Sequence, residues 1–328
     1  MASPNLSEIV TTTLRNRTRK LADNVTNNNA LLMRLNERGR IRPVTGGQNI
    51  VQELEYAENS TYKRYSGYET LDISPSDVFS AAEFDWKQAA VAVSISGLEM
   101  LQNSGRDALI DLLESRIANA ERTMQNNISS DIYSDGTANS SKQIGGLQHL
   151  VADSPSTGTV GSINRATYAF WRNVSYDATT DGGAAATNAN IQSYMNNTWR
   201  QVVRGADKPD LIVADNNYWT LYLESLQSIQ RIGDDKMAQA GFMSLKYMDA
   251  DVVLDGGFTL SGSGTRAPSN HMYFLNTNFI HFRPHRDRNM VPLDPDRFAV
   301  NQDAMVKLIA FAGNMTLSNG SLQAVLKD

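Results

Sequence analysis

The sequence predicts an α+β protein with long projections beyond its core, and three patterns indicate this class. Apolar residues recur every three or four positions over 104–134, which is typical of a long helix. Alternating apolar residues at 49–96 and 245–328 predict strands. A chain of 328 residues exceeds the size of about 250–300 residues at which one core stops growing. We therefore expect two domains, or one domain with projections.

Composition excludes several classes of protein. The chain has no cysteine, so a disulfide scaffold, a cysteine nucleophile and a zinc–thiolate site are excluded. Apolar residues make up 41% of the sequence, which is enough for a real core. No apolar run approaches the roughly 18 residues of a membrane span, and Met1–Arg15 lacks the apolar segment of a signal peptide. We expect a soluble, cytoplasmic product.

Charge is unevenly distributed along the chain. Residues 1–42 contain eight basic and three acidic residues, a net charge of +5, whereas the whole chain carries −5 and the remainder therefore −10. A basic arm on an acidic body favours a polyanion such as DNA as its partner, and a solvated amphipathic helix explains the pattern equally well. The cations expected to face DNA are Arg15, Arg17, Arg19 and Lys20, and bridges from these residues to acidic groups on neighbouring copies of the chain are the alternative.

The first 96 residues predict a broken helix followed by a projection. Helical spacing over 6–35 is interrupted at 27–29, where three asparagines compete for backbone hydrogen bonds. Residues 49–96 then predict two long strands with a polar tip, and a change of face after Trp86 indicates a bulge or a register change. An isolated hairpin is marginally stable in water, so we expect it to lie on another molecule. The predicted contact residues are Tyr62, Lys63, Arg64 and Tyr65.

Two further helical segments and a buried strand are expected in the middle of the chain. The long helix over 104–134 begins with Ser104 and Asp107 at the spacing of a capping box. A second apolar stripe covers 191–203. The remaining signals are a buried strand at 211–214 and an N-cap at Asp215 for a following helix.

The C-terminal third predicts strands. The candidates are 252–254, 272–275, 279–282 and 305–312. Asn319-Gly320 lies between two apolar runs and predicts a hairpin turn. The segment from His281 to Arg297 alternates in charge and holds three prolines, which predicts a stiff surface loop that exchanges salt bridges between subunits. A solvated turn is the alternative for this segment.

Signals for catalysis or metal binding are poor. His281 and His285 have a metal-like spacing, but Pro284 excludes a helical pair, and in a strand they would lie about 13 Å apart. No nucleophile elbow, zinc-protease motif or phosphate-binding loop occurs. We therefore expect no catalytic residues, no metal and no cofactor.

A succession of short motifs runs through the rest of the chain. They are Gly145–Leu147, Gly161–Arg165, Phe170–Asn173, Pro209–Val213, Gln227–Arg231, Asp251–Asp255, Tyr273–Thr277 and Gly313–Asn319. Each motif is weak alone, whereas their order and spacing are specific. Together they resemble the major capsid proteins of tailed double-stranded DNA bacteriophages.

The resemblance implies the Hong Kong 97-type capsid fold, an α+β fold with an arm, an extended β-hairpin loop, a peripheral domain with a long spine helix, and an axial domain. The corresponding ranges are 1–48 for the N-terminal arm, 49–96 for the extended loop, 97–149 for the peripheral domain with its spine helix, 150–265 for the axial domain and 266–328 for the return strands of the peripheral domain.

The resemblance also implies a structural protein that self-assembles into hexamers and pentamers of an icosahedral phage head. Its implied partners are other copies of itself, packaged double-stranded DNA bound without sequence specificity, a portal, a separate scaffolding protein and a decoration protein. The expected location is the virion, after assembly in the host cytoplasm. Members that crosslink use a loop lysine, a carboxylate and an asparagine. Only Lys63 is available in this loop, and without a matching triple it is expected to be solvated or salt-bridged.

By the same resemblance, two segments are expected at symmetry axes. The hexamer and pentamer centres would hold Asp234, Asp235 and Lys236. The three-fold contacts would hold Arg283, Arg286, Asp287, Arg288, Asp294, Asp296 and Arg297.

Two alternatives remain open from the sequence. An encapsulin nanocompartment shares the fold and encloses protein cargo, and the basic arm favours DNA over cargo. A cytoplasmic α/β enzyme would use the strand and helix of Asp210–Leu226, and it would need a convergent polar cleft that the sequence does not indicate.

Overall fold

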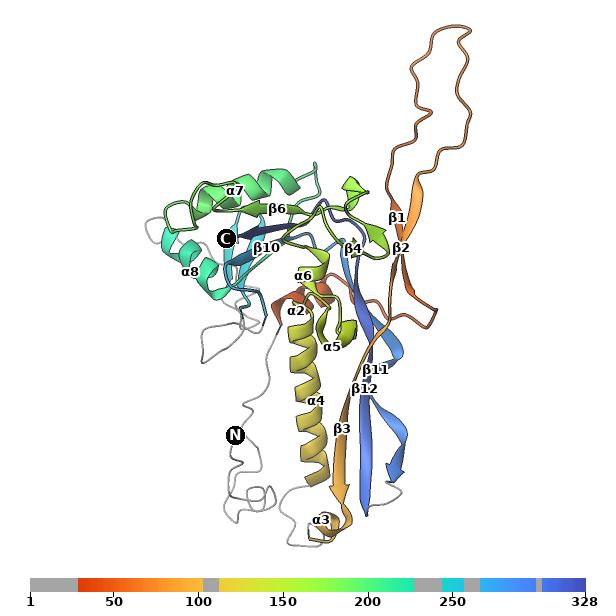
Figure 1. Ribbon diagram of the computed structural model, residues 1–328, viewed down its shortest axis with the longest axis vertical. Coiled ribbons are helices and arrows are strands. Elements are labelled where there is room, and N and C mark those ends of the chain that lie inside the picture. Colours follow the sequence, from red (N-terminus) through yellow and green to blue (C-terminus); the bar gives the residue numbers. More distant parts are fainter. Residues whose placement is uncertain (1–28, 103–111, 227–243, 257–265, 299–302) are drawn as a thin grey trace.

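Three sheets and one long helix set the shape of the molecule (Figure 1). The computed structural model describes residues 29–102, 112–226, 244–256, 266–298 and 303–328. A six-stranded sheet with its helices forms one body, a three-stranded sheet and the long helix extend from it, and a two-stranded ribbon projects from the opposite end.

The six-stranded sheet is buried on both faces. Its order is β6 (Val174–Asp177), β13 (Ala324–Lys327), β10 (His271–Leu275), β7 (Leu211–Ala214), β9 (Ala250–Leu254) and β8 (Ser244–Tyr247). In the central strand β7, Ile212 and Ala214 belong to one apolar core, and Leu211 and Val213 to the other. A strand buried on both faces needs a continuous apolar run, which is why this segment was predictable from four consecutive apolar residues.

Two helices cover one face of this sheet. They are α7 (Ile191–Val202) and α8 (Asn216–Ser225). Asp215 caps α8 as predicted, since its carboxylate accepts hydrogen bonds from the backbone N–H groups of Asn217 and Tyr218 at 3.2 and 2.8 Å. The predicted stripe of α7 is buried except for Val203, which is 39% exposed because the helix ends one residue earlier.

The other face of the sheet packs against α2 (Ala30–Glu37) and the C-terminal part of α4 (Leu112–Asp131). The predicted stripe of the long helix is buried at Ala120, Met124 and Ile128, and continues at Ile132. Asn29 caps α2 by accepting a hydrogen bond from the backbone N–H of Leu32 at 3.0 Å. The expected capping box at residues 104 and 107 lies outside the described residues.

The three-stranded sheet has the order β11 (Ile280–Phe298), β12 (Ala304–Leu317) and β3 (Lys87–Ser96). The strand over 87–96 was expected in the projection, but it pairs antiparallel with β12. The change of face after Trp86 is therefore a passage from one sheet to another rather than a bulge. A short helix, α3 (Gly97–Gln102), follows β3, and Glu99 pairs with Arg116 of α4 at 3.0 Å.

The charged segment that begins at His281 is a strand and not the predicted loop. It forms most of β11, at the edge of the three-stranded sheet, with register shifts between Pro284 and Asn289 and again beyond Leu293. Proline cannot donate to a strand ladder, and edge strands and bulges are the positions that tolerate it. Three prolines therefore indicated an edge strand here.

The predicted hairpin at Asn319-Gly320 is also wrong. Strand β12 pairs with β11 and β3, whereas β13 pairs with β10 and β6, so the chain crosses between two sheets at this point. A Cβ added at Gly320 would lie 2.4 Å from the carbonyl oxygen of Trp171. Glycine is required there because of close packing rather than a two-residue turn.

Short elements lie between α4 and the six-stranded sheet in the sequence, near the root of the projection. They are α5 (Ala138–Ser141), α6 (Leu147–Leu150), β4 (Thr159–Val160), β5 (Ile163–Asn164) and the 3-10 turn η1 (Ala169–Trp171). The projection itself starts with β1 (Ile50–Glu55) and returns with β2 (Phe79–Phe84). No helix in the described part of the chain is long and apolar enough to cross a membrane.

Candidate assembly surfaces

The root of the projection is anchored in the main core. On the inner face of the β1–β2 ribbon, Ile50, Leu54, Ala82 and Phe84 are all buried. Gly161, in the turn between β4 and β5, has a φ of +57°, and its carbonyl accepts a hydrogen bond from the backbone N–H of Glu83 at 3.0 Å. A Cβ there would lie 2.8 Å from Ala82, so glycine allows the turn to support the ribbon.

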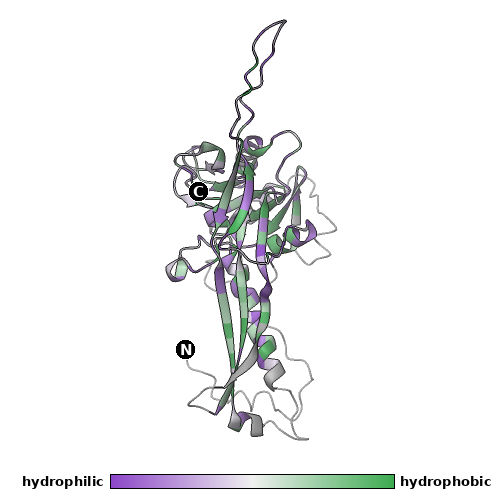
Figure 2. Ribbon diagram, turned by 90° about the vertical axis from the view of Figure 1, so that its right-hand side faces the viewer, coloured by the Kyte–Doolittle hydropathy of each residue, from purple (hydrophilic) through white to green (hydrophobic). Residues whose placement is uncertain are grey.

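The part of the projection beyond the two strands stands clear of the body. Residues 56–78 contain no strand, and they extend away from the body in both Figure 1 and Figure 2. Large apolar side chains in this segment are exposed. They are Tyr62 (79%), Tyr65 (64%), Tyr68, Leu71 and Ile73 (94%). A run of exposed apolar groups on a narrow ribbon indicates a surface that another molecule covers.

The four residues predicted to contact a neighbour lie on this segment. Lys63 forms an ion pair with Glu69 at 3.2 Å and donates a hydrogen bond to the carbonyl of Thr70 at 3.3 Å. Tyr62, Arg64 and Tyr65 are exposed beside it. The structure therefore brings these residues together at the tip, and their contact with a second subunit stays a prediction.

An aromatic groove lies where the projection meets the body. It is lined by Tyr56 and Phe79 of the ribbon and by Tyr168 and Phe170 of the connecting segment, and it has a volume of 460 Å³. The ring of Phe170 lies 5.4 Å from that of Tyr56 and 6.0 Å from that of Tyr168. Phe79 is 75% exposed, so the apolar surface of the projection continues into this groove.

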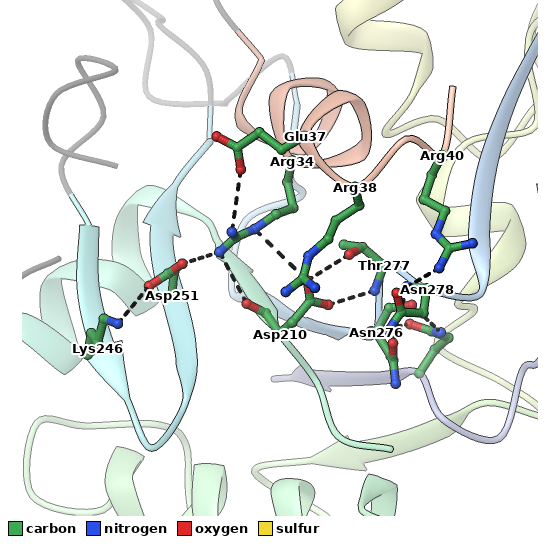
Figure 3. A network of polar contacts seen from close by, with 11 residues as sticks. Arg34, Glu37, Arg38, Arg40, Asp210, Lys246, Asp251, Asn276, Thr277 and Asn278 are labelled. Carbon is green, nitrogen blue, oxygen red and sulfur yellow. Dashed lines mark hydrogen bonds and ion pairs between the residues drawn. The ribbon is translucent and has the colours of Figure 1, made fainter. Parts of the chain in front are cut away.

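A network of ion pairs fastens α2 to the six-stranded sheet (Figure 3). Arg34 pairs with Asp251 at the start of β9 and contacts Asp210 at 4.0 Å, and Arg38 pairs with the same Asp210 at 3.5 Å. Asp210 also accepts a hydrogen bond from the hydroxyl of Thr277 at 2.7 Å. The network therefore holds α2, which the sequence prediction assigned to the N-terminal arm, against the six-stranded sheet.

A second polar centre is almost completely buried. Asp255, 3% exposed, pairs with Arg266 and accepts hydrogen bonds from the Tyr133 hydroxyl at 2.6 Å and from the backbone N–H of Ala30 at 3.2 Å. It therefore joins α2, the end of α4 and the sheet. Burial, together with the neighbouring carboxylate of Asp255, raises the pKa of Tyr133 well above its ordinary value, so the phenol stays a donor.

Neither polar centre was predicted from the sequence. Their acidic members do belong to the capsid-like motifs Pro209–Val213 and Asp251–Asp255, where each follows or precedes an apolar strand. An acidic residue at the end of a buried strand was therefore the available signal.

His281 lies buried among cations in β11. Burial, together with the guanidinium groups of Arg283, Arg40 and Arg42, lowers the pKa of His281 from 6.5 to about 4. Its imidazole is 5% exposed and neutral at neutral pH. Within the described residues, no three acidic or histidine side chains come together as a group that could hold a metal ion.

This depressed pKa predicts a loss of stability in mild acid. Between about pH 6.5 and 4 only the unfolded chain takes up the His281 proton, so the free energy of unfolding falls, by at most about 1.4 kcal/mol per pH unit from this residue. Above pH 6.5 the residue contributes no pH dependence. For His281→Gln we expect the difference in urea-unfolding free energy from the wild type to shrink as the pH falls through this window. A difference that stays constant with pH would contradict the prediction.

Several predicted site residues lie outside the described residues. They are the arm cations Arg15, Arg17, Arg19 and Lys20, and the central-loop residues Asp234, Asp235 and Lys236. The side chains of Asp294, Asp296 and Arg297 are also not described, although their backbone belongs to β11. The other residues predicted for the three-fold contact, Arg283, Arg286, Asp287 and Arg288, lie together near Pro284.

Known structures match the whole chain, although no protein-family model and no curated protein matches it. The cyanophage A-1(L) capsid asymmetric unit matches 96% of this chain and 97% of its own, with a TM-score of 0.67 and 18% identity. The capsid of an empty GTA particle matches 100% and 99%, with a TM-score of 0.58 and 9% identity. The holo-SrpI encapsulin complex from Synechococcus elongatus matches 98% and 95%, with a TM-score of 0.58 and 9% identity.

These matches identify the architecture. The described residues have the Hong Kong 97-type capsid fold, with an α+β arrangement of elongated sheet, long helix and projecting ribbon. The fold that the sequence motifs implied is confirmed.

Proposed function

We propose that this chain is the major capsid protein of a tailed double-stranded DNA phage. The observation that carries the proposal is the projection, which has exposed apolar side chains and no core of its own, on a chain that matches capsid subunits from end to end. Such a segment is stabilised by the surface of a neighbour. The function of the protein is then association with other copies of itself, without bond-making chemistry.

Closing a shell requires contacts between unlike surfaces of identical subunits. Head-to-tail contacts that close give rings, and a closed shell combines several of them. Permanent assemblies bury about 2,000–5,000 Å² or more in total. The projection, the aromatic groove and the elongated sheet provide separate surfaces for such contacts.

The proposal is tested by the size and shape of the purified protein. We expect the full chain, expressed alone or with its scaffolding partner, to form particles that elute in the void volume of gel filtration and appear as closed shells in electron micrographs. A protein that remains a monomer or a small oligomer under both conditions would argue for the enzyme alternative.

The finer assignments remain part of this proposal. Hexamers and pentamers would place residues 234–236 around their axes, and Arg283–Arg288 would lie at three-fold contacts. The arm cations would contact DNA phosphates without reading bases. A reconstruction of the particle tests all three placements, and an arm on the outer surface would exclude its contact with DNA. The proposed partners also include a portal, a scaffolding protein and a decoration protein. The shell would assemble in the host cytoplasm and would then be part of the virion.

An encapsulin shell is the second candidate, because one matching structure is an encapsulin complex. The cyanophage capsid has the higher TM-score and identity of the two, and the basic N-terminal segment favours DNA as the content. Nuclease-protected DNA inside the particles supports a phage head, whereas co-purified protein cargo supports an encapsulin.

A further inference from the structure

The outer face of the projection is acidic, and Glu83 on this face accepts a hydrogen bond from the side chain of Asn49 at 3.1 Å. Residues 50–84 contain seven acidic and two basic residues, a net charge of −5. In β1 the buried residues alternate with Glu53 and Glu55, which are exposed on the outer face, and Glu83 of β2 is exposed on the same face opposite Val51. Among the described residues, none forms an ion pair with these three glutamates.

A cationic strip lies near the root of the same projection. Residues 40–44 run parallel to β11, held by hydrogen bonds from the Arg42 N–H to the Phe282 carbonyl and from the Arg286 N–H to the Val44 carbonyl, both at 3.0 Å. The strip, residues 40–44 with 281–288, contains five arginines and one aspartate, a net charge of +4. The arginines are Arg40, Arg42, Arg283, Arg286 and Arg288.

These arginines lack carboxylate partners within the described part of the subunit. Arg40 donates to the Asn278 side chain and Arg283 to the Gln52 side chain, each at 2.9 Å, and both acceptors are neutral. Arg286 and Arg288 are exposed. Like charges gathered on one surface repel each other, so an anionic partner from outside the subunit would stabilise the strip.

The subunit's own projection does not supply this partner. Arg283 contacts Gln52, which shares the inner face of β1 with the buried Ile50 and Leu54. Glu53 and Glu55 have the opposite parity and therefore point away from the strip of their own subunit. They line a hollow with Arg204 of the same subunit, which pairs with Asp207 at 3.3 Å.

We propose that the acidic outer face of the projection docks on the cationic strip of a second copy of this chain. This rests on the proposed function and names the surface that receives the projection. It gives Arg283, Arg286 and Arg288 a partner other than the three-fold contact proposed above, and recovery of the combined variant described below would not be expected from a three-fold contact. The two surfaces differ and are complementary in charge, as a repeating head-to-tail contact requires. Complementary charge sets the register of the contact, while the exposed aromatic side chains of the projection supply apolar burial.

The test reverses the charge of each surface separately and then of both. The strip variant is Arg286→Glu with Arg288→Glu, and the ribbon variant is Glu53→Lys with Glu55→Lys. A matched control, Lys142→Glu with Arg200→Glu, makes the same change in net charge as the strip variant at exposed positions outside both surfaces. The readout is the fraction of the full-length protein that sediments as closed particles at about 0.1 M and about 1 M salt, where the screening length falls from about 10 to about 3 Å.

At the lower salt we expect each reversed variant to give roughly a tenfold lower particle yield, because like charges then face each other. The particle yield of the variant that combines all four changes should recover to within about twofold of the wild-type yield. The particle yield of the control should equal that of the wild type. At the higher salt concentration, the differences in particle yield between the reversed variants and the wild type should become smaller.

Three outcomes overturn the inference. They are wild-type assembly of the strip variant, failure of the combined variant to recover although it is soluble and folded, and normal shells of the strip variant that hold less nuclease-protected DNA. The last outcome would assign the strip to DNA. Absence of particles from the wild type and the control at both salt concentrations would instead refute the proposed function.

Discussion

Deletion of Ala57–Gly67 is expected to leave a soluble, folded subunit that forms no shells. The deleted residues lie beyond the two paired strands of the projection, whose inner face is buried at Ile50, Leu54 and Phe84. The core therefore keeps its packing, while the subunit loses Tyr62 and Tyr65, which are among its most exposed apolar side chains. We expect the thermal unfolding of the isolated subunit to be nearly unchanged and the particle fraction, measured by sedimentation, to fall to background.

Lys63→Ala tests whether the contact predicted at the tip needs the amino group of Lys63. Its amino group is engaged by Glu69 and Thr70 within the tip, and an exposed ion pair contributes only about 0–1 kcal/mol. The variant should therefore assemble like the wild type. Normal heads from the deletion would show that the projection is dispensable, and loss of assembly in Lys63→Ala alone would show that this amino group has a role of its own.

The second large effect is expected at the buried carboxylate of Asp255. Asp255→Ala removes the ion pair with Arg266 and the acceptor for both Tyr133 and the first turn of α2. Arg266 is 8% exposed, and removing one partner of a buried ion pair costs about 3–5 kcal/mol. We expect a fall of this size in the free energy of unfolding, measured by urea denaturation. The measurement uses protein that also carries the Ala57–Gly67 deletion, because assembly then does not add to stability.

Asp207→Ala is the matched control for Asp255→Ala. Asp207 pairs with Arg204 at 3.3 Å, and both side chains are exposed. Exposed pairs contribute little, so this variant should lose less than about 1 kcal/mol. Equal losses in the two variants would show that burial does not set the importance of the Asp255 pair.

Local pattern was enough to predict many individual elements. The buried strand β7, the stripe of α7 and the cap at Asp215 were all predictable, because each depends on residues close in sequence. The exposed tip with Tyr62 and Tyr65 was predictable for the same reason, since a short ribbon cannot bury its own apolar groups. The order and spacing of the short sequence motifs additionally predicted the fold.

The sequence by itself determined many of the helices and strands and which of their faces are apolar, whereas the charged segment from His281 was predicted as a loop and forms most of β11. Tertiary structure decided which strands pair. Strand β3 pairs with β12 and not within the projection, and the chain at Asn319-Gly320 crosses between two sheets and forms no hairpin. Backbone hydrogen bonds are the same for any partner strand, and an alternating pattern shows that a face is buried without showing against what. The polar centres depend even more on tertiary structure, because Ala30, Tyr133 and Asp255 come from three distant parts of the chain and meet only once the sheet, α2 and α4 have packed.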